Sequence, residues 1–281
     1  MKKLLLVLSA FAMFFGSCSK SEDVAPVSVD SNPVVASNFL VSKIITTSVG
    51  QTETENITYI GNKLVEIAFT NGEKTKFTYT GNLITKIEEF DGTTLNSIET
   101  LNYNIDGKLS SYLEVNYFSP LGGGPTGRKV EYTYDTAGNI LFTTFDGSAT
   151  SQTNQYSTGK AIITQGQITK IEEYIPANTI NNSPAYTATE TITYDDKIFS
   201  GINVMGFNKI TMQGTELGFY GAIHNILTVT KKNGAVLVST DDSTYTYNSS
   251  NFPITENNIS KSYNANGQVL STISLSNQIF Y

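Results

Sequence analysis

The chain has 281 residues, of which 18 are basic and 25 are acidic, so its formal net charge is −7. Binding to nucleic acid needs clustered Lys and Arg, and an acidic chain whose single arginine is Arg128 is not expected to bind DNA or RNA. One histidine and one cysteine are too few for a zinc site built from several such ligands.

Residues 1–17 predict a secretory signal peptide. Two lysines precede an apolar run of twelve residues, and two small residues follow it directly before Cys18. Twelve helical residues span about 18 Å, against roughly 30 Å of bilayer hydrocarbon, so this run is too short to cross a membrane. Gly16-Ser17-Cys18 resembles the lipobox of bacterial lipoproteins, with Phe15 in place of the usual leucine.

Cys18 is the only cysteine, so the chain cannot form an internal disulfide. The lipobox resemblance implies that this thiol carries a diacylglyceryl group and that an acyl chain caps the new N-terminus. Because two acyl chains already hold a protein stably on a membrane, three are expected to make the attachment permanent. We therefore expect the membrane to be a partner of the protein through lipid on Cys18.

The residues after Cys18 resemble the surface-export signal of some Gram-negative lipoproteins. This resemblance implies an outer-membrane lipoprotein that faces the cell surface, whereas a plain solvated tether would leave it facing the periplasm. The residues of this candidate signal are Ser19, Lys20, Ser21, Glu22 and Asp23.

Residues 18–38 predict a flexible tether after the lipidated cysteine, because they lack aromatic residues and contain Pro26 and Pro33. The body runs from residue 39 to 281, enough for one large all-β domain or two small ones. Removal of residues 1–17 takes away two lysines and no acid, which leaves the mature chain with 16 basic and 25 acidic residues.

A tyrosine–glycine unit repeats along the body. Alternating Tyr, Thr, Ile and Phe predict a strand with one buried face, and the following Gly with Asn or Asp supplies the positive φ of a tight hairpin turn. We therefore predict an all-β fold of repeated antiparallel hairpins that form a large curled or barrel-like sheet, open or closed, with little or no helix beyond the signal peptide. A glycine-rich stretch, Ile202–Leu227, interrupts the repeat and predicts irregular connections with a helical turn. The units are Ile57–Ile67, Phe77–Ile87, Leu101–Leu109, Tyr132–Ile140, Thr191–Ile198, Tyr245–Asn248 and Tyr263–Val269.

The repeats resemble the tyrosine–aspartate (YD, or Rhs-type) repeats of bacterial surface proteins, with Tyr134-Asp135 and Gly138-Asn139-Ile140 nearest to that pattern. The whole chain resembles uncharacterised bacterial envelope lipoproteins that combine a lipobox, a polar tether and degenerate repeats of this kind. This resemblance implies a β-sheet scaffold displayed at the cell envelope and implies no reaction.

Paired carboxylates are the candidates for catalysis, as in glycoside hydrolysis. Adjacent residues on a strand point to opposite faces, so Glu88-Glu89 and Glu172-Glu173 are expected on strand surfaces. Asp195-Asp196 and Asp241-Asp242 are expected in turns. The single histidine, His224, lacks a nucleophile-elbow pattern around it and is interpreted as a satisfied loop or core residue.

The glycine-rich stretch Ser119–Arg128 lacks the pattern of a phosphate-binding loop and predicts a long hairpin loop. No residues indicate a cofactor or a resident metal. Most of the sixteen tyrosines share one position of the repeat, which favours core packing or strand pairing over ligand binding.

Three functions remain open. The leading hypothesis is a non-catalytic, lipid-anchored envelope protein whose β-sheet is a scaffold or a binding surface for a glycan, a peptide or a neighbouring envelope protein. The second is a glycan hydrolase that brings two carboxylates together from distant repeats, and the third is a partner of a secreted toxin system.

Overall fold

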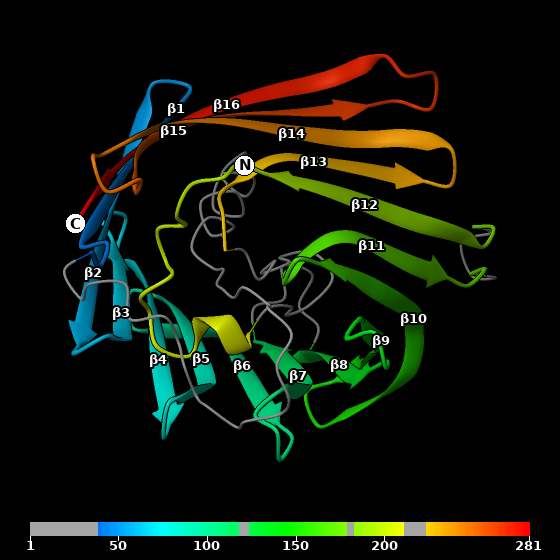
Figure 1. The fold of residues 1–281 in the computed structure, drawn as a ribbon. Helices are drawn as coiled ribbons and strands as arrows, with labels where there is room; N and C mark the ends of the chain where they lie inside the picture. Colours follow the sequence, from blue (N-terminus) through cyan, green and yellow to red (C-terminus); the bar gives the residue numbers. More distant parts are fainter. Residues whose placement is uncertain (1–38, 118–123, 179–182, 211–222) are drawn as a thin grey trace.

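The computed structural model describes residues 39–117, 124–178, 183–210 and 223–281, and these form an all-β barrel (Figure 1). The predicted signal peptide, Cys18, the export signal and the tether fall on residues 1–38 and lie outside the described residues. No helix in the described ranges is long and apolar enough to cross a membrane. The strands are β1 Lys43–Ser48, β2 Gln51–Ile60, β3 Lys63–Phe69, β4 Glu73–Thr80, β5 Leu83–Asp91, β6 Thr94–Tyr103, β7 Leu109–Asn116, β8 Thr126–Tyr134, β9 Ile140–Ser148, β10 Ser151–Thr164, β11 Gln167–Ile175, β12 Tyr186–Tyr194, β13 Ile226–Asn233, β14 Val236–Tyr247, β15 Pro253–Tyr263 and β16 Val269–Phe280.

Each strand pairs antiparallel with the strands before and after it in the chain, and β1 pairs with β16 to close the barrel. The closing register sets Ile44 opposite Ile279 and Thr46 opposite Asn277. The predicted all-β fold of antiparallel hairpins is confirmed, and of the two arrangements that the sequence left open the closed barrel is the one observed.

The barrel wall is built as the repeat predicts, with tight turns where the chain reverses. Gly61 and Gly81 end β2 and β4 with φ of +63° and +59°, a region that L-residues other than glycine rarely adopt. The strand β8 begins at Thr126, so the end of the predicted Ser119–Arg128 loop is strand, whereas residues 118–123 lie outside the description.

Large apolar side chains face the inside of the barrel near one of its ends. Strand alternation puts Ile57, Ile67, Phe77 and Ile87 on this inner face, each less than a tenth exposed. A barrel of sixteen strands encloses more space than wall side chains alone fill. Another segment of the chain therefore contributes to the core.

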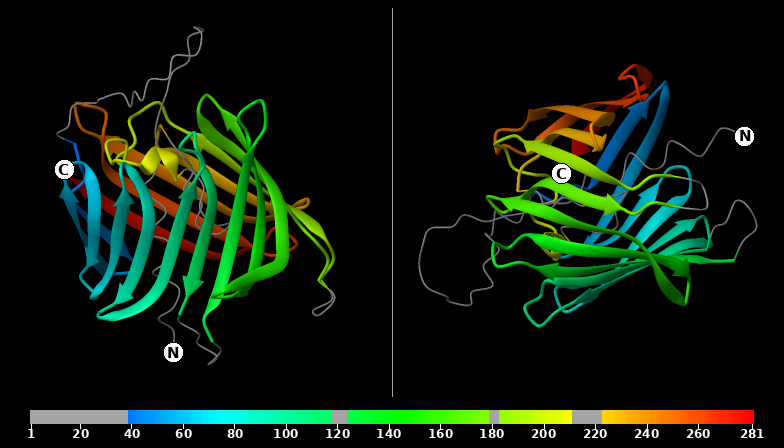
Figure 2. Two further views of the ribbon diagram at one scale, coloured as in Figure 1. Left: turned by 90° about the horizontal axis from the view of Figure 1, so that it is seen from below. Right: turned by 90° about the vertical axis from the view of Figure 1, so that its right-hand side faces the viewer.

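That segment lies between β12 and β13, at the end of the barrel where the hairpin turns of β2–β3 and β4–β5 lie (yellow in Figure 2, left). Its described part contains the predicted helical turn, a 3-10 helix at Phe207–Lys209. The Met205 N–H donates to Asn62 O at 2.8 Å, and a Cβ at Gly206 would lie 2.8 Å from Asn82 O. Its buried apolar residues are Phe199, Val204, Phe207 and Ile210.

A tyrosine near the end of most even-numbered strands ties that strand to the start of the strand before it. Tyr103 on β6 donates its hydroxyl to Ile84 O on β5 at 2.7 Å, while its ring packs against the core. Burial raises the pKa of these phenols, that of Tyr134 to about 12, so they stay protonated and can donate at neutral pH. The other donor–acceptor pairs are Tyr59–Val41, Tyr134–Leu109, Tyr194–Ile168, Tyr245–Ile226 and Tyr281–Pro253, at 2.6 to 3.0 Å.

Tyr79 makes the same connection differently, because its oxygen accepts the Leu64 N–H at 3.1 Å and its hydroxyl donates to Met205 O at 3.2 Å. The predicted role of the repeated tyrosines in core packing and strand pairing is confirmed. We call this set of hydroxyl contacts the tyrosine ring.

Replacement of Tyr103 by Phe is expected to destabilise the barrel by about 1–2 kcal/mol, because it removes one half-buried hydrogen bond and keeps the packing of the aromatic ring. Urea denaturation measures the change. Tyr174→Phe is the matched control, since Tyr174 is half exposed and its loss of a hydroxyl is expected to leave the free energy of unfolding unchanged. Equal loss in both variants would contradict a role for the tyrosine ring.

Candidate functional site

The inner face changes from apolar to acidic along the barrel. Register places twelve carboxylates and two basic residues, Arg128 and Lys231, on the inward positions of the strands. Ten strand lysines take outward positions instead. We call the inward carboxylates the acidic lining. It consists of Glu53, Glu55, Glu73, Glu89, Asp91, Glu99, Glu114, Asp146, Glu173, Glu190, Asp241 and Glu256.

Several of these carboxylates accept a hydrogen bond from a serine of a neighbouring strand. Ser97 Oγ donates to Glu89 at 2.9 Å, and Ser243 Oγ donates to Glu256 at 2.8 Å. Ser157 and Ser260 donate in the same way to Glu173 and Asp241. Neutral donors hold the carboxylates in place without supplying the positive charge that a buried anion needs.

Burial raises the pKa of part of the acidic lining. The pKa of Glu55 is raised to about 8, first by burial and then by the charge of Glu53. The neighbouring strands present Ile44, Thr46 and Phe69 to it and no basic group. Burial also raises the pKa of Glu89, Glu190 and Glu256, although serine donors or Lys231 oppose the rise.

The glutamate pairs divide between the two faces of the wall, as the sequence predicts. Glu89 faces inward, whereas Glu88 lies outside and pairs with Lys86 at 2.9 Å. Glu173 faces inward, whereas Glu172 pairs outside with Lys170 at 2.6 Å. Neither pair of neighbours can therefore flank a single bond.

The prediction of a turn at Asp241-Asp242 is wrong, because both residues lie within β14. The threonine-rich sequence around them continues the strand, and Asp241 pairs with Val229 while Asp242 faces outward. The prediction at Asp195-Asp196 is confirmed. Asp195 starts the connection after β12 and accepts the backbone N–H groups of Lys197 and Asn225, both at 3.0 Å.

His224 is a satisfied loop residue, as predicted. Its Nδ1 lies 2.7 Å from Lys197 O, and its backbone N–H donates to Gln167 Oε1 at 3.1 Å. Near it, a cavity of about 20 Å³, room for a water molecule, lies between the β12–β13 connection and the wall. Its polar lining includes Asn225, Tyr245 and Glu256.

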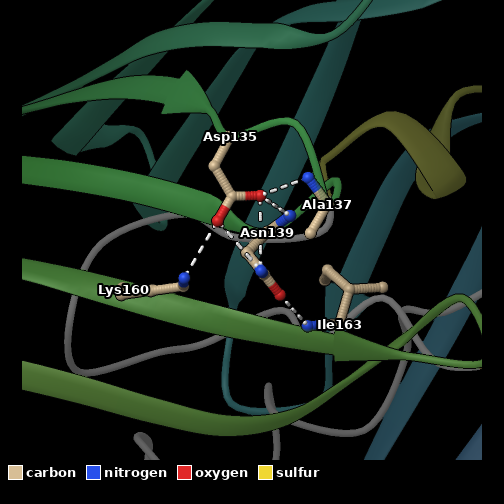
Figure 3. Close-up of polar contacts among 5 residues, drawn as sticks. All are labelled: Asp135, Ala137, Asn139, Lys160 and Ile163. Carbon is tan, nitrogen blue, oxygen red and sulfur yellow. Dashed lines mark hydrogen bonds and ion pairs between the residues drawn. The ribbon is translucent and has the colours of Figure 1, made fainter.

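Asp135, the aspartate of the repeat nearest to the tyrosine–aspartate pattern, caps a turn (Figure 3). Asp135 accepts the backbone N–H groups of Ala137 and Asn139, both at 2.9 Å, and pairs with Lys160 Nζ at 2.9 Å. Asn139 in turn accepts the Ile163 N–H at 3.0 Å. These bonds hold the pKa of Asp135 far below its usual range. Asn104, Asn248 and Asn264 cap the corresponding turns with the same pair of backbone contacts.

The outer face of the wall is mostly polar, with apolar residues among them such as Ile98, Val115 and Phe145. All four outward positions of β12 are threonine, and those of β4 are Lys74, Lys76, Thr78 and Thr80. Outward apolar residues lie among charged ones, as Phe90 does beneath the ammonium groups of Lys74 and Lys76 at 5.3 and 5.5 Å. Barrels that face lipid carry an apolar band outside and a polar interior, which is the reverse of this distribution.

Sequence reasoning missed the acidic lining because its members are spread over many strands. The signal was present in the alternation, since Glu55 and Glu89 stand two residues from the buried Ile57 and Ile87 and so share their face. Within the described ranges, no group of three His, Cys, Asp or Glu residues could hold a metal ion.

No protein-family model matches the chain, and no curated protein matches its sequence. A porin-like protein from Bacteroides vulgatus ATCC 8482 covers 87% of this chain and 99% of its own, at 13% identity and a TM-score of 0.54. The chain shares the fold of that protein. A porin-like protein from Bacteroides uniformis ATCC 8492 covers 85% of this chain and 96% of its own, at 15% identity and a TM-score of 0.47.

Replacement of Asp135 by Ala is expected to lower the urea midpoint of unfolding more than replacement by Asn does. Asn keeps a side-chain oxygen for the turn and loses the ion pair with Lys160, whereas Ala loses both. Urea denaturation at low and high salt separates the two contributions. A midpoint for Asp135→Asn as low as that for Asp135→Ala would show that the charge matters more than the turn.

Glu55 is expected to make the barrel less stable as pH rises from 4.5 to about 8. The pKa of Glu55 is about 8 in the folded state and 4.5 ordinarily. Between these two pH values the folded protein keeps a proton on Glu55 that the unfolded protein releases. The contribution of Glu55 to the free energy of unfolding is therefore fully present below pH 4.5 and is lost as pH rises towards 8. Glu55→Gln is expected to match the parent near pH 4.5 and to exceed it by at least about 1 kcal/mol near pH 8 in urea denaturation.

Glu66→Gln, on the outward face of the adjacent strand, is the control for this prediction and is expected to follow the parent at both pH values. A parallel pH dependence in the parent and in Glu55→Gln would contradict the inward, uncompensated position of Glu55.

Proposed function

We propose that the protein is a non-catalytic binding module of the bacterial envelope, anchored by lipid on Cys18, with its barrel in water beside the membrane. The observation that carries this proposal is the polarity of the barrel wall, which is mostly polar and charged outside and apolar or acidic inside. An outward lysine such as Lys74 or Lys76 would cost about 2–4 kcal/mol at the middle of a bilayer, so the wall favours water as its surroundings.

A barrel with such a wall needs another means of attachment if it is to stay at a membrane. The lipobox resemblance around Cys18 supplies one, and the tether over residues 18–38 would separate the barrel from the lipid headgroups. The candidate export signal, residues 19–23, favours the outer membrane and the cell surface, with the periplasmic face as the alternative.

The interior of the barrel favours a role in ligand binding over a purely structural role. Strand side chains fill a small barrel, but sixteen strands give a wide one, and here the apolar half is filled with the help of the β12–β13 connection. The other half carries buried and half-buried carboxylates, an arrangement that costs stability if it only fills space. The name porin-like belongs to the similar Bacteroides proteins, and a pore through lipid is not what the wall of this chain favours.

Replacement of Cys18 by Ala is expected to abolish incorporation of radiolabelled palmitate and to release the protein from washed membranes into the soluble fraction. The physical reason is that the lipid, and not the wall, is proposed to hold the protein at the membrane. Ser19→Ala is the matched control and is expected to stay labelled and membrane-bound.

The same cells report orientation, because protease added to intact cells is expected to remove the parent protein if it faces outward. Persistence in membranes, after a sodium carbonate wash, of a Cys18→Ala chain that has lost residues 1–17 would overturn the proposal, since the barrel would then be held in the bilayer by its own wall.

A further inference from the structure

We propose that the cavity between the β12–β13 connection and the barrel wall binds one monovalent metal cation. Glu256 supplies the negative charge of this site, and Ser200 and Asn225 supply neutral oxygen ligands. The proposal does not depend on the ligand-binding role of the barrel interior, because these three residues line a separate cavity at the junction of the connection and the wall.

The size of the cavity limits what can occupy it. Its volume of about 20 Å³ holds one water-sized group and excludes organic molecules. The connection contributes Ser200 and Asn225 to its lining, and the wall contributes Ile44 of β1, Glu256 of β15 and Asn277 of β16. The occupant is therefore either a water molecule or a small ion.

Glu256 is the charged group of the cavity and is only 4% exposed. Ser243 Oγ donates to its Oε1 at 2.8 Å, and Asn277 Nδ2 donates to its Oε2 at 3.1 Å. The Tyr245 hydroxyl lies 3.0 Å from Oε1 and also 2.9 Å from Ile226 O, and a phenol has one proton for these two acceptors. When Tyr245 donates to Ile226, the carboxylate keeps two neutral donors.

No basic side chain of the described ranges forms an ion pair with Glu256. Its neighbours across the sheet are Tyr245 on β14 and Asn277 on β16, which are both neutral at neutral pH. Lys197 of the connection pairs instead with Asp196, at 3.0 Å. A buried carboxylate needs either a positive charge beside it or a proton of its own.

Two neutral groups of the cavity point independently to a ligand. Ser200 is only 4% exposed, and its side chain has no hydrogen-bond partner among the described residues. Asn225 is 2% exposed and donates its Nδ2 to Asp195 Oδ2 at 2.9 Å and to Ile198 O at 3.4 Å, whereas no described residue donates to its Oδ1. Buried polar atoms almost always have partners, so a group inside the cavity is expected to supply them.

A singly charged cation satisfies both the charge and the neutral oxygens. A water molecule could bind Ser200 and Asn225 but would leave the charge of Glu256 unbalanced. A calcium ion takes six to eight oxygen ligands, and the described acids form no cluster of three that could hold such a metal. One carboxylate balances one positive charge, and the small volume favours sodium over the larger potassium ion.

The test is urea denaturation of the full-length lipoprotein in mild non-ionic detergent, at constant pH and ionic strength, in NaCl, KCl or choline chloride. Choline is too large for the cavity. We expect the highest urea midpoint in NaCl, the lowest in choline chloride, and an intermediate one in KCl. At a sodium concentration ten times the Kd, the equilibrium constant for unfolding is expected to fall about tenfold.

Glu256→Gln is expected to abolish the difference between NaCl and choline chloride, because it replaces the carboxylate by a neutral amide of the same shape. Glu89→Gln is the matched control, since Glu89 is another inward glutamate with a serine donor and is absent from the cavity lining. It is expected to keep the difference. Ser200→Ala keeps the carboxylate and is expected to weaken sodium affinity about fivefold, through the loss of one neutral contact.

Equal urea midpoints in the three salts would overturn the cation site and assign the cavity to water, with a proton on Glu256. A sodium effect that Glu256→Gln retains would also overturn it, because the ion would then act elsewhere on the protein. Both results would leave the lipid anchor and the water-facing wall to be decided by the Cys18 experiment.

Discussion

The hydroxyl of a half-buried tyrosine, donated to the backbone carbonyl at the start of the preceding strand, is the contact on which the regularity of this barrel depends. A phenol can make it only from an inward position at the end of a strand, so the contact fixes which residues of that strand face inside. Once Tyr103 is inward, Leu101, Glu99 and Ser97 follow on the same face by alternation. A shift of one residue would turn the apolar and acidic residues outward and bring threonine into the core.

The tyrosine ring also shows that units of a degenerate repeat can keep the same structural role with different residues. On β10, isoleucine takes the place of tyrosine at residue 163, and its backbone N–H donates to Asn139. Asn139 donates to Asp135, which also accepts from Lys160. The connection between strands is thus kept by other polar groups. The aspartate of the tyrosine–aspartate pair acts in the turn, and the tyrosine acts along the wall.

Much of the fold could be predicted from the sequence because it is local. Alternation and Gly-containing turns define hairpins within about twenty residues, which is also the separation of Tyr59 and Tyr79 in the sequence. Barrel closure could not be predicted, because it depends on twist and stagger summed over all strands. The acid pairs were predicted where alternation decides them, as at Glu88-Glu89, and wrongly at Asp241-Asp242, where the propensity of Asp for turns gave way to strand pairing. The acidic lining requires knowledge of which strands face one another, which one strand does not contain.

The pairing of β1 with β16 has a consequence for how the chain reaches its native state. Lys43 and Phe280 are register partners although almost the whole body separates them in sequence, and the lysine ammonium lies 4.2 Å from the phenylalanine ring. Contacts of such high sequence separation form late and make folding slow. Until then β1 is an uncovered sheet edge, able to pair with another chain. The charge of Lys43 at that edge disfavours such pairing, so the residue protects the unfinished barrel before it contributes to the finished one.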